Sequence, residues 1–271
     1  MKLWTVLLLL LFFSCSTIKL KVPPRTSQLT GTGFYKSAAS FNWKQRDSFA
    51  LSELYKGNIP SFLLKFVPVE VQWFDSSSQK LIRAKYFVSP DYLGLGTGQD
   101  WARINITPLA AQKFADSLGC FLPTRKMVDD IYKTAEIKLE PVPMYAYRDS
   151  TPTMYQHHLI IEGQRKNKKG LIAGIKKDVV ITGKLIRDGL TRSGEPRVAI
   201  YGWHKPGGQP IQPLYTGHVY WWVDYSQGIR LVYRKIKVNG KWLDYTDVLK
   251  DPVLRRLLCD EEYCDFYKYP Y

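Results

Sequence analysis

Residues 107–135 read TPLAAQKFADSLGCFLPTRKMVDDIYKTA and carry two consecutive helix signals. Thr107 is a favourable N-cap, Pro108 suits the first helical position, and Gly119 suits the end of that helix. Thr124 repeats the N-cap signal for a second helix. Apolar residues recur at helical spacing in both segments, at Leu109, Ala110, Phe114, Ala115 and Leu118 and then at Met127, Val128, Ile131 and Ala135. The stretch predicts a pair of short helices joined by a tight turn.

Strand patterns flank this helix pair on both sides. Phe62–Phe74 alternates strongly enough for a strand, Lys80–Ser89 is a second such run, and the turn that begins at Asp75 makes them a hairpin candidate. Pro68 indicates an edge or a break in the first strand. The second half predicts mainly strands, then a turn at Asn239-Gly240, a short strand and a last helix around Thr246–Leu258. The predicted strands are His158–Glu162, Lys177–Thr182, Arg197–Trp203, His218–Tyr225 and Ile229–Val238.

The order of these elements favours an α+β fold. Helices and strands are segregated rather than alternating, which argues against a doubly wound sheet. We expect residues 34–271 to form one domain, with a mostly antiparallel sheet and the helix pair packed against it; a subdivision near residue 145 is the alternative. The 271 residues are 45% hydrophobic and 14% aromatic, which excludes wholesale disorder. The sequence also lacks the run of about 18 apolar residues that a transmembrane helix needs.

The N-terminus has the pattern of an export signal. Lys2 precedes the apolar run Leu3–Phe13, and small residues follow around Cys15. This run is too short to span a bilayer of about 30 Å and has the length of a signal-peptide core. The stretch resembles a bacterial lipoprotein signal, in which residues 1–14 are removed and Cys15 receives the lipid; simple cleavage just past Ser16 is the alternative. We expect a cell-envelope protein, lipid-anchored to a membrane or else secreted or periplasmic.

Residues 15–33 separate this signal from the predicted domain. They contain two prolines, scattered small polar residues and little apolar periodicity. Such a composition predicts a tether that lifts the domain off the membrane.

Four cysteines are too few for a disulfide-framework protein. If Cys15 carries lipid, Cys120, Cys259 and Cys264 remain in an oxidising compartment. Cys259 and Cys264 are close enough in sequence to close a small disulfide loop, but three thiols allow three pairings and the sequence does not choose among them. The spacing does not suggest zinc, and we expect no metal and no cofactor.

The chain is strongly basic, with 39 Lys and Arg against 24 Asp and Glu and a net charge of +15. Removal of residues 1–14 takes away only Lys2 and leaves +14. Residues 162–200 hold ten basic and four acidic side chains. In the cytosol this excess would favour nucleic acid, but outside it anionic glycans, peptidoglycan carboxylates and lipid headgroups are the abundant polyanions. We therefore expect an envelope polyanion as partner and not nucleic acid; a merely solvated basic face is the alternative.

The densest group of chemically active residues is Tyr201–Arg230. Extended alternation from His218 places Tyr220, Trp222, Asp224 and Ser226 on one face, and a turn at Gln227-Gly228 returns Arg230 toward them. This pattern predicts three catalytic residues and five ligand-binding residues. His218 is the predicted base, Asp224 its orienting partner or an acid, and Ser226 a nucleophile or hydrogen-bond partner; the predicted ligand-binding residues are Arg230, Trp222, Tyr220, Trp203 and His204.

Two other readings of the same group stay open. Aromatic faces stack on sugar rings while acidic and basic side chains bind hydroxyls, so the group also suits a glycan-binding site without catalysis. A hydrogen-bonded hairpin with a partly buried Asp and Arg would need no ligand at all.

Four segments resemble an uncharacterised family of secreted bacterial proteins and lipoproteins. They read LGCFLPTRKMVDDIY, AGIKKDVVIT, IYGWHKPGGQPIQPLYTGH and VDYSQGIRLV, and the likeness covers about residues 85–235. The DYS-x-G-IRLV string is its most specific part. The family pattern commonly has histidine where this chain has Gln227 and Ile175. The resemblance implies no known activity, and if those histidines are catalytic in relatives, their loss favours binding over catalysis.

Three functions follow as expectations. The first is a hydrolase acting on envelope glycan or peptide. The second is a non-catalytic glycan- or peptidoglycan-binding protein that uses the same aromatic and polar face. The third is a structural scaffold of the envelope without a small ligand.

Overall fold

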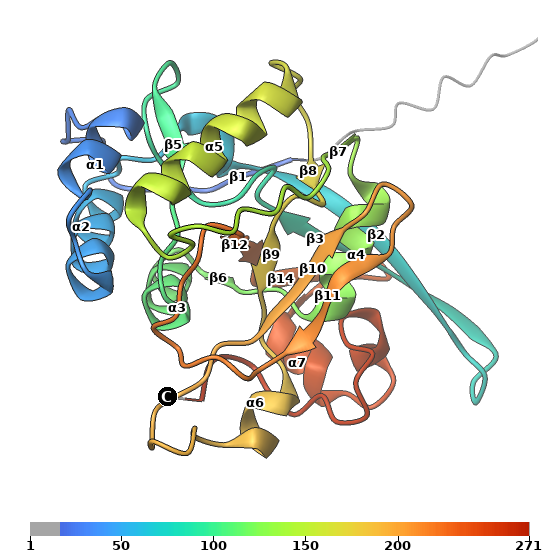
Figure 1. Ribbon diagram of the computed structural model, residues 1–271. Helices are drawn as coiled ribbons and strands as arrows, with labels where there is room; N and C mark the ends of the chain where they lie inside the picture. The colour runs from blue at the N-terminus through green and yellow to red at the C-terminus, as the bar shows by residue number, and fades with distance from the viewer. Residues whose placement is uncertain (1–16, 271) are drawn as a thin grey trace, which may run out of the picture.

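The structure, a computed structural model, describes residues 17–270, so the predicted signal peptide and Cys15 lie outside the described residues. In this part of the chain, helices lie around a mostly antiparallel large sheet, which confirms the α+β fold (Figure 1). No helix among residues 17–270 is long and apolar enough to cross a membrane.

The helices are α1 Gly31–Ser37, α2 Trp43–Tyr55, α3 Pro108–Ser117, α4 Arg125–Thr134, α5 Thr151–Arg165, α6 Gly183–Asp188 and α7 Tyr245–Lys250, with short 3-10 turns at Ser61–Leu64 and Leu254–Leu257. The strands are β1 Ile18–Lys19, β2 Lys65–Asp75, β3 Lys80–Val88, β4 Gly94–Gly96, β5 Trp101–Arg103, β6 Cys120–Phe121, β7 Ile137–Lys138, β8 Ile172–Ala173, β9 Lys177–Val179, β10 Ile200–His204, β11 Pro210–Tyr215, β12 Gln227–Gly228, β13 Val232–Tyr233, β14 Lys235–Val238 and β15 Lys241–Asp244.

The large sheet contains the predicted hairpin. Its strand order is β1-β2-β3-β13-β6, and the β14–β15 hairpin attaches to β3. β2 and β3 pair continuously from Val67↔Val88 to Asp75↔Lys80, so the ladder runs through Pro68 without a break. The far half of this pair projects from the body as a two-stranded ribbon, at the lower right of Figure 1. Asn239-Gly240 turns β14 into β15, as predicted.

A second sheet, ordered β11-β10-β9-β12, holds most of the candidate site residues. β10 runs antiparallel to β9 and β11, whereas β12 pairs with β9 in parallel through Gln227↔Lys177 and Gly228↔Asp178. The parallel pair brings the segment around Ser226 to the start of β9, because the Lys177 amide donates to the Ser226 carbonyl over 2.8 Å.

Both predicted helices of the 107–135 stretch form, and their predicted caps are confirmed. The Thr107 side chain accepts from the Ala110 amide and the Thr124 side chain accepts from the Met127 amide. However, the segment between them is not a plain tight turn. Cys120 and Phe121 form β6, which pairs with β13 of the large sheet. The two helices therefore pack on different elements, α3 against β6 and α4 against β10.

Three of the predicted strands differ most from the structure. His158–Glu162 lies inside α5, which Ser150 caps at its N-terminus. His218–Tyr225 is an irregular loop whose one bridge joins Val219 to Arg197. Ile229–Val238 is interrupted between β13 and β14, where the register against β3 changes from Val232↔Val88 to Lys237↔Lys85.

The described part of the predicted tether belongs to the folded body. β1 pairs with the base of β2, Leu20 is buried, and Arg25 donates to the carbonyls of Ser27, Leu29 and Gly96. A tether would leave these backbone groups to water. The prediction is therefore wrong for the described residues from 17 onward, and the folded body begins at β1 rather than at residue 34.

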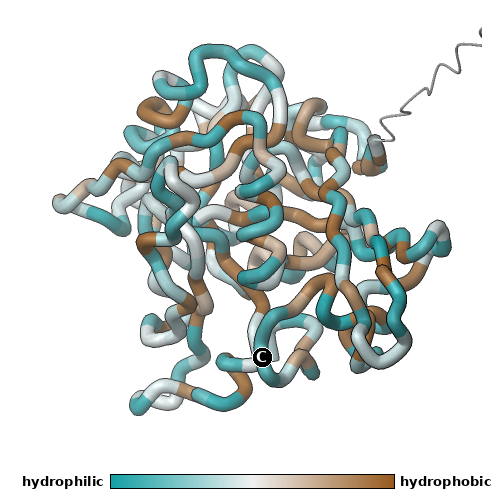
Figure 2. The backbone as a smooth tube through the Cα atoms, turned by 90° about the vertical axis from the view of Figure 1, so that its right-hand side faces the viewer, coloured by the Kyte–Doolittle hydropathy of each residue, from teal (hydrophilic) through white to brown (hydrophobic). Residues whose placement is uncertain are grey.

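Apolar side chains from both sheets and the surrounding helices form one large core. Its most deeply buried members include Phe66, Tyr86, Phe114, Phe121 and Tyr225. Figure 2 shows hydrophilic stretches on many of the outermost loops and hydrophobic stretches crossing the middle of the molecule. Cys120 is a buried free thiol, and burial raises its pKa far above the ordinary value.

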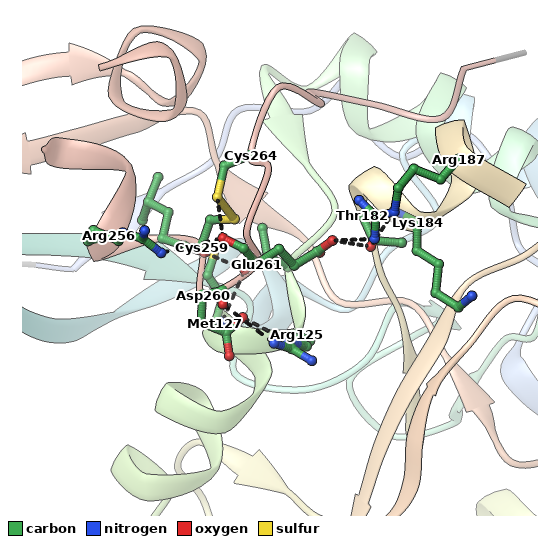
Figure 3. Close-up of a disulfide and its surroundings, with 12 residues drawn as sticks. Arg125, Met127, Thr182, Lys184, Arg187, Arg256, Cys259, Asp260, Glu261 and Cys264 are labelled. Carbon is green, nitrogen blue, oxygen red and sulfur yellow. Dashed lines mark hydrogen bonds and ion pairs between the residues drawn. A yellow bond between two sulfur atoms is a disulfide. The ribbon is translucent and has the colours of Figure 1, made fainter. Parts of the chain in front are cut away.

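Of the three thiol pairings that the sequence leaves open, the structure contains the bond between Cys259 and Cys264 (Figure 3). It closes the segment after α7 against the body, where two of the enclosed acids make long-range contacts. Asp260 pairs with Arg125 of α4 at 2.8 Å, and Glu261 accepts from the Thr182 hydroxyl at 2.8 Å. The C-terminal segment is thus fixed to both α4 and the N-terminus of α6.

Candidate functional site

The predicted constellation on the loop His218–Arg230 is only partly assembled. Asp224 is buried, and its Oδ1 accepts from the Ser226 amide at 2.9 Å and from the Ser226 hydroxyl at 2.6 Å. Its Oδ2 accepts from Arg148 Nη2 at 2.8 Å. These contacts form an Asx-type turn that fixes the loop. Both oxygens of the Asp224 carboxylate thus accept hydrogen bonds from groups of the protein itself.

The backbone around Asp224 is held by donors from distant segments. The Asn105 amide group lies 2.8 Å from the Asp224 carbonyl and 2.6 Å from the Gln227 carbonyl. Lys176 Nζ donates to the Tyr225 carbonyl over 2.6 Å. Burial, with the nearby Arg103, lowers the pKa of Lys176 to about 7 despite the opposing charge of Asp224. The loop therefore packs on buried polar side chains, which bind its backbone carbonyls.

Ser226 and His218 do not form a nucleophile and base. Ser226 is completely buried, at 0% exposure, and its hydroxyl donates to Asp224. The His218 ring is half-buried between Tyr215 and Trp222, and it makes no hydrogen bond within residues 17–270. Burial lowers the pKa of His218, although Asp224 opposes that shift. Activation of a serine would require a direct hydrogen bond to the histidine.

Arg230 lies away from this group, which corrects its predicted role as an anion binder. Its side chain is fully buried, and it donates to the carbonyls of Ser89 at 2.9 Å and Ile172 at 2.7 Å. It also pairs with Asp178 at 3.6 Å and lies over the Tyr92 ring at 4.3 Å. Arg230 ties β3, β8 and β9 together inside the molecule.

The predicted aromatic ligand binders are divided among different surroundings. Tyr220 packs edge-on against Trp43, and Trp222 lies beside His218. Trp203 is nearly buried, and its backbone has a φ of +58°, a strained conformation for a bulky residue. The ring of Trp203 lies 4.7 Å from Lys177 Nζ. Burial lowers the pKa of Lys177, a shift that Asp224 opposes.

His204 lies at a different place, in a pocket of about 450 Å³ between α4 and the β10–β11 hairpin. Its Nε2 lies 2.8 Å from Asp129 Oδ1. The Tyr201 hydroxyl donates to the same carboxylate, at 2.9 Å from Oδ1 and 3.0 Å from Oδ2. Because a carboxylate only accepts, the His204 Nε2 carries the hydrogen of this bond. His204 and Tyr201 thus fix the Asp129 carboxylate by hydrogen bonds, and Asp129 stays half-buried at the pocket wall.

The mouth of this pocket is formed by the turn between β10 and β11. Pro206, Gly207 and Gly208 line it, and the Gly208 amide donates to the Lys205 carbonyl to close the turn. Gly208 has a φ of +88°, which requires glycine. The Tyr132 hydroxyl donates to the Lys205 carbonyl over 2.7 Å and so fixes the turn to α4.

Two exposed lysines bring positive charge to the same pocket. Lys138 Nζ lies over the Tyr132 ring at 5.2 Å. Lys133 directly follows Tyr132 on α4 and lies 3.8 Å from the Asp130 carboxylate. The Tyr132 ring also stacks on His204 with ring centres 4.5 Å apart. The pocket thus presents a fixed carboxylate next to two ammonium groups, which suits a ligand with hydroxyl or amide donors and an anionic group.

Sequence reasoning identified His204 but missed the residues that make its site. Asp129 and Tyr132 lie on α4, where their spacing is that of an ordinary helix face, and Lys138 follows that helix. Lys177 and Arg148 were likewise missed beside Asp224. The conspicuous basic stretch 162–200 is not one solvated face, since Lys176 and Lys177 within it are buried.

No family model, curated protein or solved structure matches the chain. The resemblance of residues 85–235 to a secreted bacterial family therefore stays a prediction. Both candidate sites are interpreted from their own geometry.

Proposed function

We propose that the protein is an exported, lipid-anchored component of a bacterial envelope that binds an anionic glycan such as peptidoglycan. The observation that supports binding is the arrangement of Asp129, which two donors hold at the wall of an open pocket beside Lys133 and Lys138. A preformed carboxylate accepts hydrogen bonds from sugar hydroxyls or amides without reorganising. The two lysines supply the complement to a carboxylate of the ligand.

The fixed position of His204 favours binding over catalysis at this pocket. Its Nε2 is occupied by Asp129, and the side chain is almost fully buried. A general base must reach the proton that it removes. Of the ionisable side chains that line this pocket, Tyr132, Tyr201 and His204 are buried, whereas Asp129, Lys133 and Lys138 are not. We therefore expect the site to hold a ligand rather than to use His204 as a base.

The test is sedimentation with purified peptidoglycan sacculi. Asp129→Asn keeps the shape of the side chain and removes its charge, and Lys138→Gln removes a cation. Each substitution is expected to weaken binding about tenfold, the effect of one charge-assisted hydrogen bond. Asp149→Asn, an exposed acid outside the pocket, is the matched control and should bind like the parent chain. Equal binding by the Asp129→Asn and Asp149→Asn variants would refute the proposal.

The anchor is tested separately. Cys15→Ser removes the only thiol that could carry the lipid at the predicted cleavage site, so the variant is expected to leave the membrane fraction. Its retention there, with the same electrophoretic mobility as the parent chain, would contradict lipidation at Cys15.

A hydrolase is the second candidate, and the observation that favours it is the state of His218. Its ring has no hydrogen-bond partner among the described residues and lies in the field of the buried Asp224. Acid–base chemistry would therefore use His218 directly, without Ser226. Release of soluble fragments from sacculi by the parent chain but not by His218→Gln would establish this activity; no release by either would exclude it.

A further inference from the structure

The β2–β3 ribbon has an outer face on which large apolar side chains lie beside charged ones. We define this outer face by the residues Glu70, Gln72, Phe74, Leu81, Arg83, Lys85, Lys237 and Trp242. The register places them together: Phe74 lies opposite Leu81, Gln72 opposite Arg83 and Glu70 opposite Lys85. Lys237 of β14 pairs with Lys85, and Trp242 of β15 pairs with Lys237. Paired residues point to the same side of a sheet.

Large apolar side chains are exposed on this face. Phe74 is 51% exposed, its cross-strand partner Leu81 39%, and Trp242 50%. Trp73, on the other side near the tip of the ribbon, is 41% exposed. Ser76, Ser77 and Ser78 follow at the exposed tip, so no other part of the described body covers the end of the ribbon (Figure 1). Removing these apolar side chains from water, by contact with a partner, would therefore be favourable.

Cations lie between these apolar groups. A groove of about 650 Å³ runs along the outer face, and its charged lining residues are Arg83, Lys85, Lys237 and Glu70. Lys85 pairs with Glu70 at 2.7 Å. Arg83 and Lys237 pair with no carboxylate within residues 17–270, and Lys237 Nζ lies 6.0 Å from the centre of the Trp242 ring. Two cations are thus left available for an anionic partner.

We propose that the outer face docks on an anionic lipid bilayer. Phe74, Leu81 and Trp242 enter the boundary between headgroups and acyl chains, where aromatic side chains are favoured. Arg83 and Lys237 contact the lipid phosphates from the groove. This combination distinguishes the outer face from a simple basic patch. The apolar side chains favour a partner that excludes water, and the cations favour a partner that carries negative charge next to that apolar region.

The position of β1 constrains how the ribbon lies. Ile18 pairs with Phe66 at the base of β2, so a lipid on Cys15 would enter the bilayer within about 10 Å of that base. Phe74 lies eight residues farther along β2, about 26 Å away. The anchor and the tip reach one plane only if the ribbon lies along the bilayer, and docking then turns its outer face toward the lipid. This orientation rests on the proposed anchor, whereas docking itself does not.

The test uses the chain from Thr17 onward, which contains every described element and the large core, and which lacks the signal segment. It is sedimented with vesicles of phosphatidylcholine, with or without phosphatidylglycerol. We expect binding only to the anionic vesicles, with a blue shift of tryptophan fluorescence. Arg83→Gln with Lys237→Gln should weaken binding about 30-fold, because each cation near the surface contributes about fivefold. Phe74→Ser with Leu81→Ser should abolish the fluorescence shift.

Lys168→Gln with Lys169→Gln is the matched control, since it removes two exposed cations from another surface. If this control weakens binding as much as the Arg83 and Lys237 pair, the attraction is only to net charge and the proposal fails. The docking proposal also fails if the parent chain does not bind anionic vesicles. Binding of a protein by the outer face, without binding of vesicles, would be one such result. Sacculus binding through Asp129 is measured independently, so either proposal can fail alone.

Discussion

The loop from His218 to Arg230 and the pocket around Asp129 contain the same kinds of residues, each with a histidine, an aspartate and aromatic rings. In the loop, the Asp224 carboxylate accepts from Ser226 and Arg148, and Arg230 is directed into the core. In the pocket, Asp129 is held from behind by His204 and Tyr201 and keeps an open side. Residue types alone do not distinguish the two arrangements. The difference is that the Asp224 carboxylate is buried and bonded within the protein, whereas the Asp129 carboxylate lies at the wall of an open pocket.

The largest expected effect tests the polar interior on which the loop rests. His157 and His158 of α5 are buried near Lys176 and Arg103, and burial, assisted by these cations, lowers each histidine pKa to about 2. The unfolded chain takes up these protons below pH about 6.5, whereas the folded chain does not. As the pH falls below about 6.5, the free energy of unfolding should therefore decrease by about 1.4 kcal/mol per pH unit for each histidine. For both histidines over two pH units, the decrease should be about 5 kcal/mol.

Urea titrations over a series of pH values measure this slope. His157→Asn should reduce it by one proton, or about 1.4 kcal/mol per pH unit, below pH about 6.5. An unchanged slope would show that His157 is protonated in the folded protein. The polar interior would then be open to water, and the contrast with the pocket would be lost.

The next effect separates an internal arginine from a surface one. Arg230→Met should lower the free energy of unfolding by about 4 kcal/mol, since it leaves Asp178 buried without its cation and frees two buried carbonyls. Arg148→Met, which removes an exposed partner of Asp224, should cost only about 1 kcal/mol. Urea unfolding of both variants makes the comparison. Similar costs for the two would contradict the assignment of Arg230 to the core.

The smallest effect concerns Ser226. Ser226→Ala removes one hydrogen bond to Asp224 and should cost about 1 kcal/mol in the free energy of unfolding. Because Ser226 is completely buried, sacculus binding should not change. A loss of sacculus binding or of fragment release in this variant, at unchanged melting temperature, would instead make the loop the functional site.

Local signals account for the part of the fold that the sequence predicts correctly. The caps at Thr107 and Thr124, the turn at Asn239-Gly240 and the bond between Cys259 and Cys264 each depend on partners a few residues away. Ser150 would have revealed α5 in the same way, because it caps that helix. The prediction of a strand at His158–Glu162 overlooked that cap.

The loop could not be predicted from local pattern, because distant residues determine its path. The alternating aromatic residues from His218 to Tyr225 fit a strand equally well. Asn105, Arg148 and Lys176 hold the chain in a different course, and each comes from a separate segment. The pocket was missed for a related reason: Asp129 acquires its role only where α4 meets β10.

A crystal structure of the protein with a soluble peptidoglycan fragment, a disaccharide carrying its peptide, would show whether the pocket around Asp129 binds the ligand. We expect the fragment to lie in the pocket, with a hydroxyl or amide donating to Asp129 and a carboxylate near Lys138. A fragment bound between His218 and Trp222, with the pocket at Asp129 left vacant, would contradict this expectation.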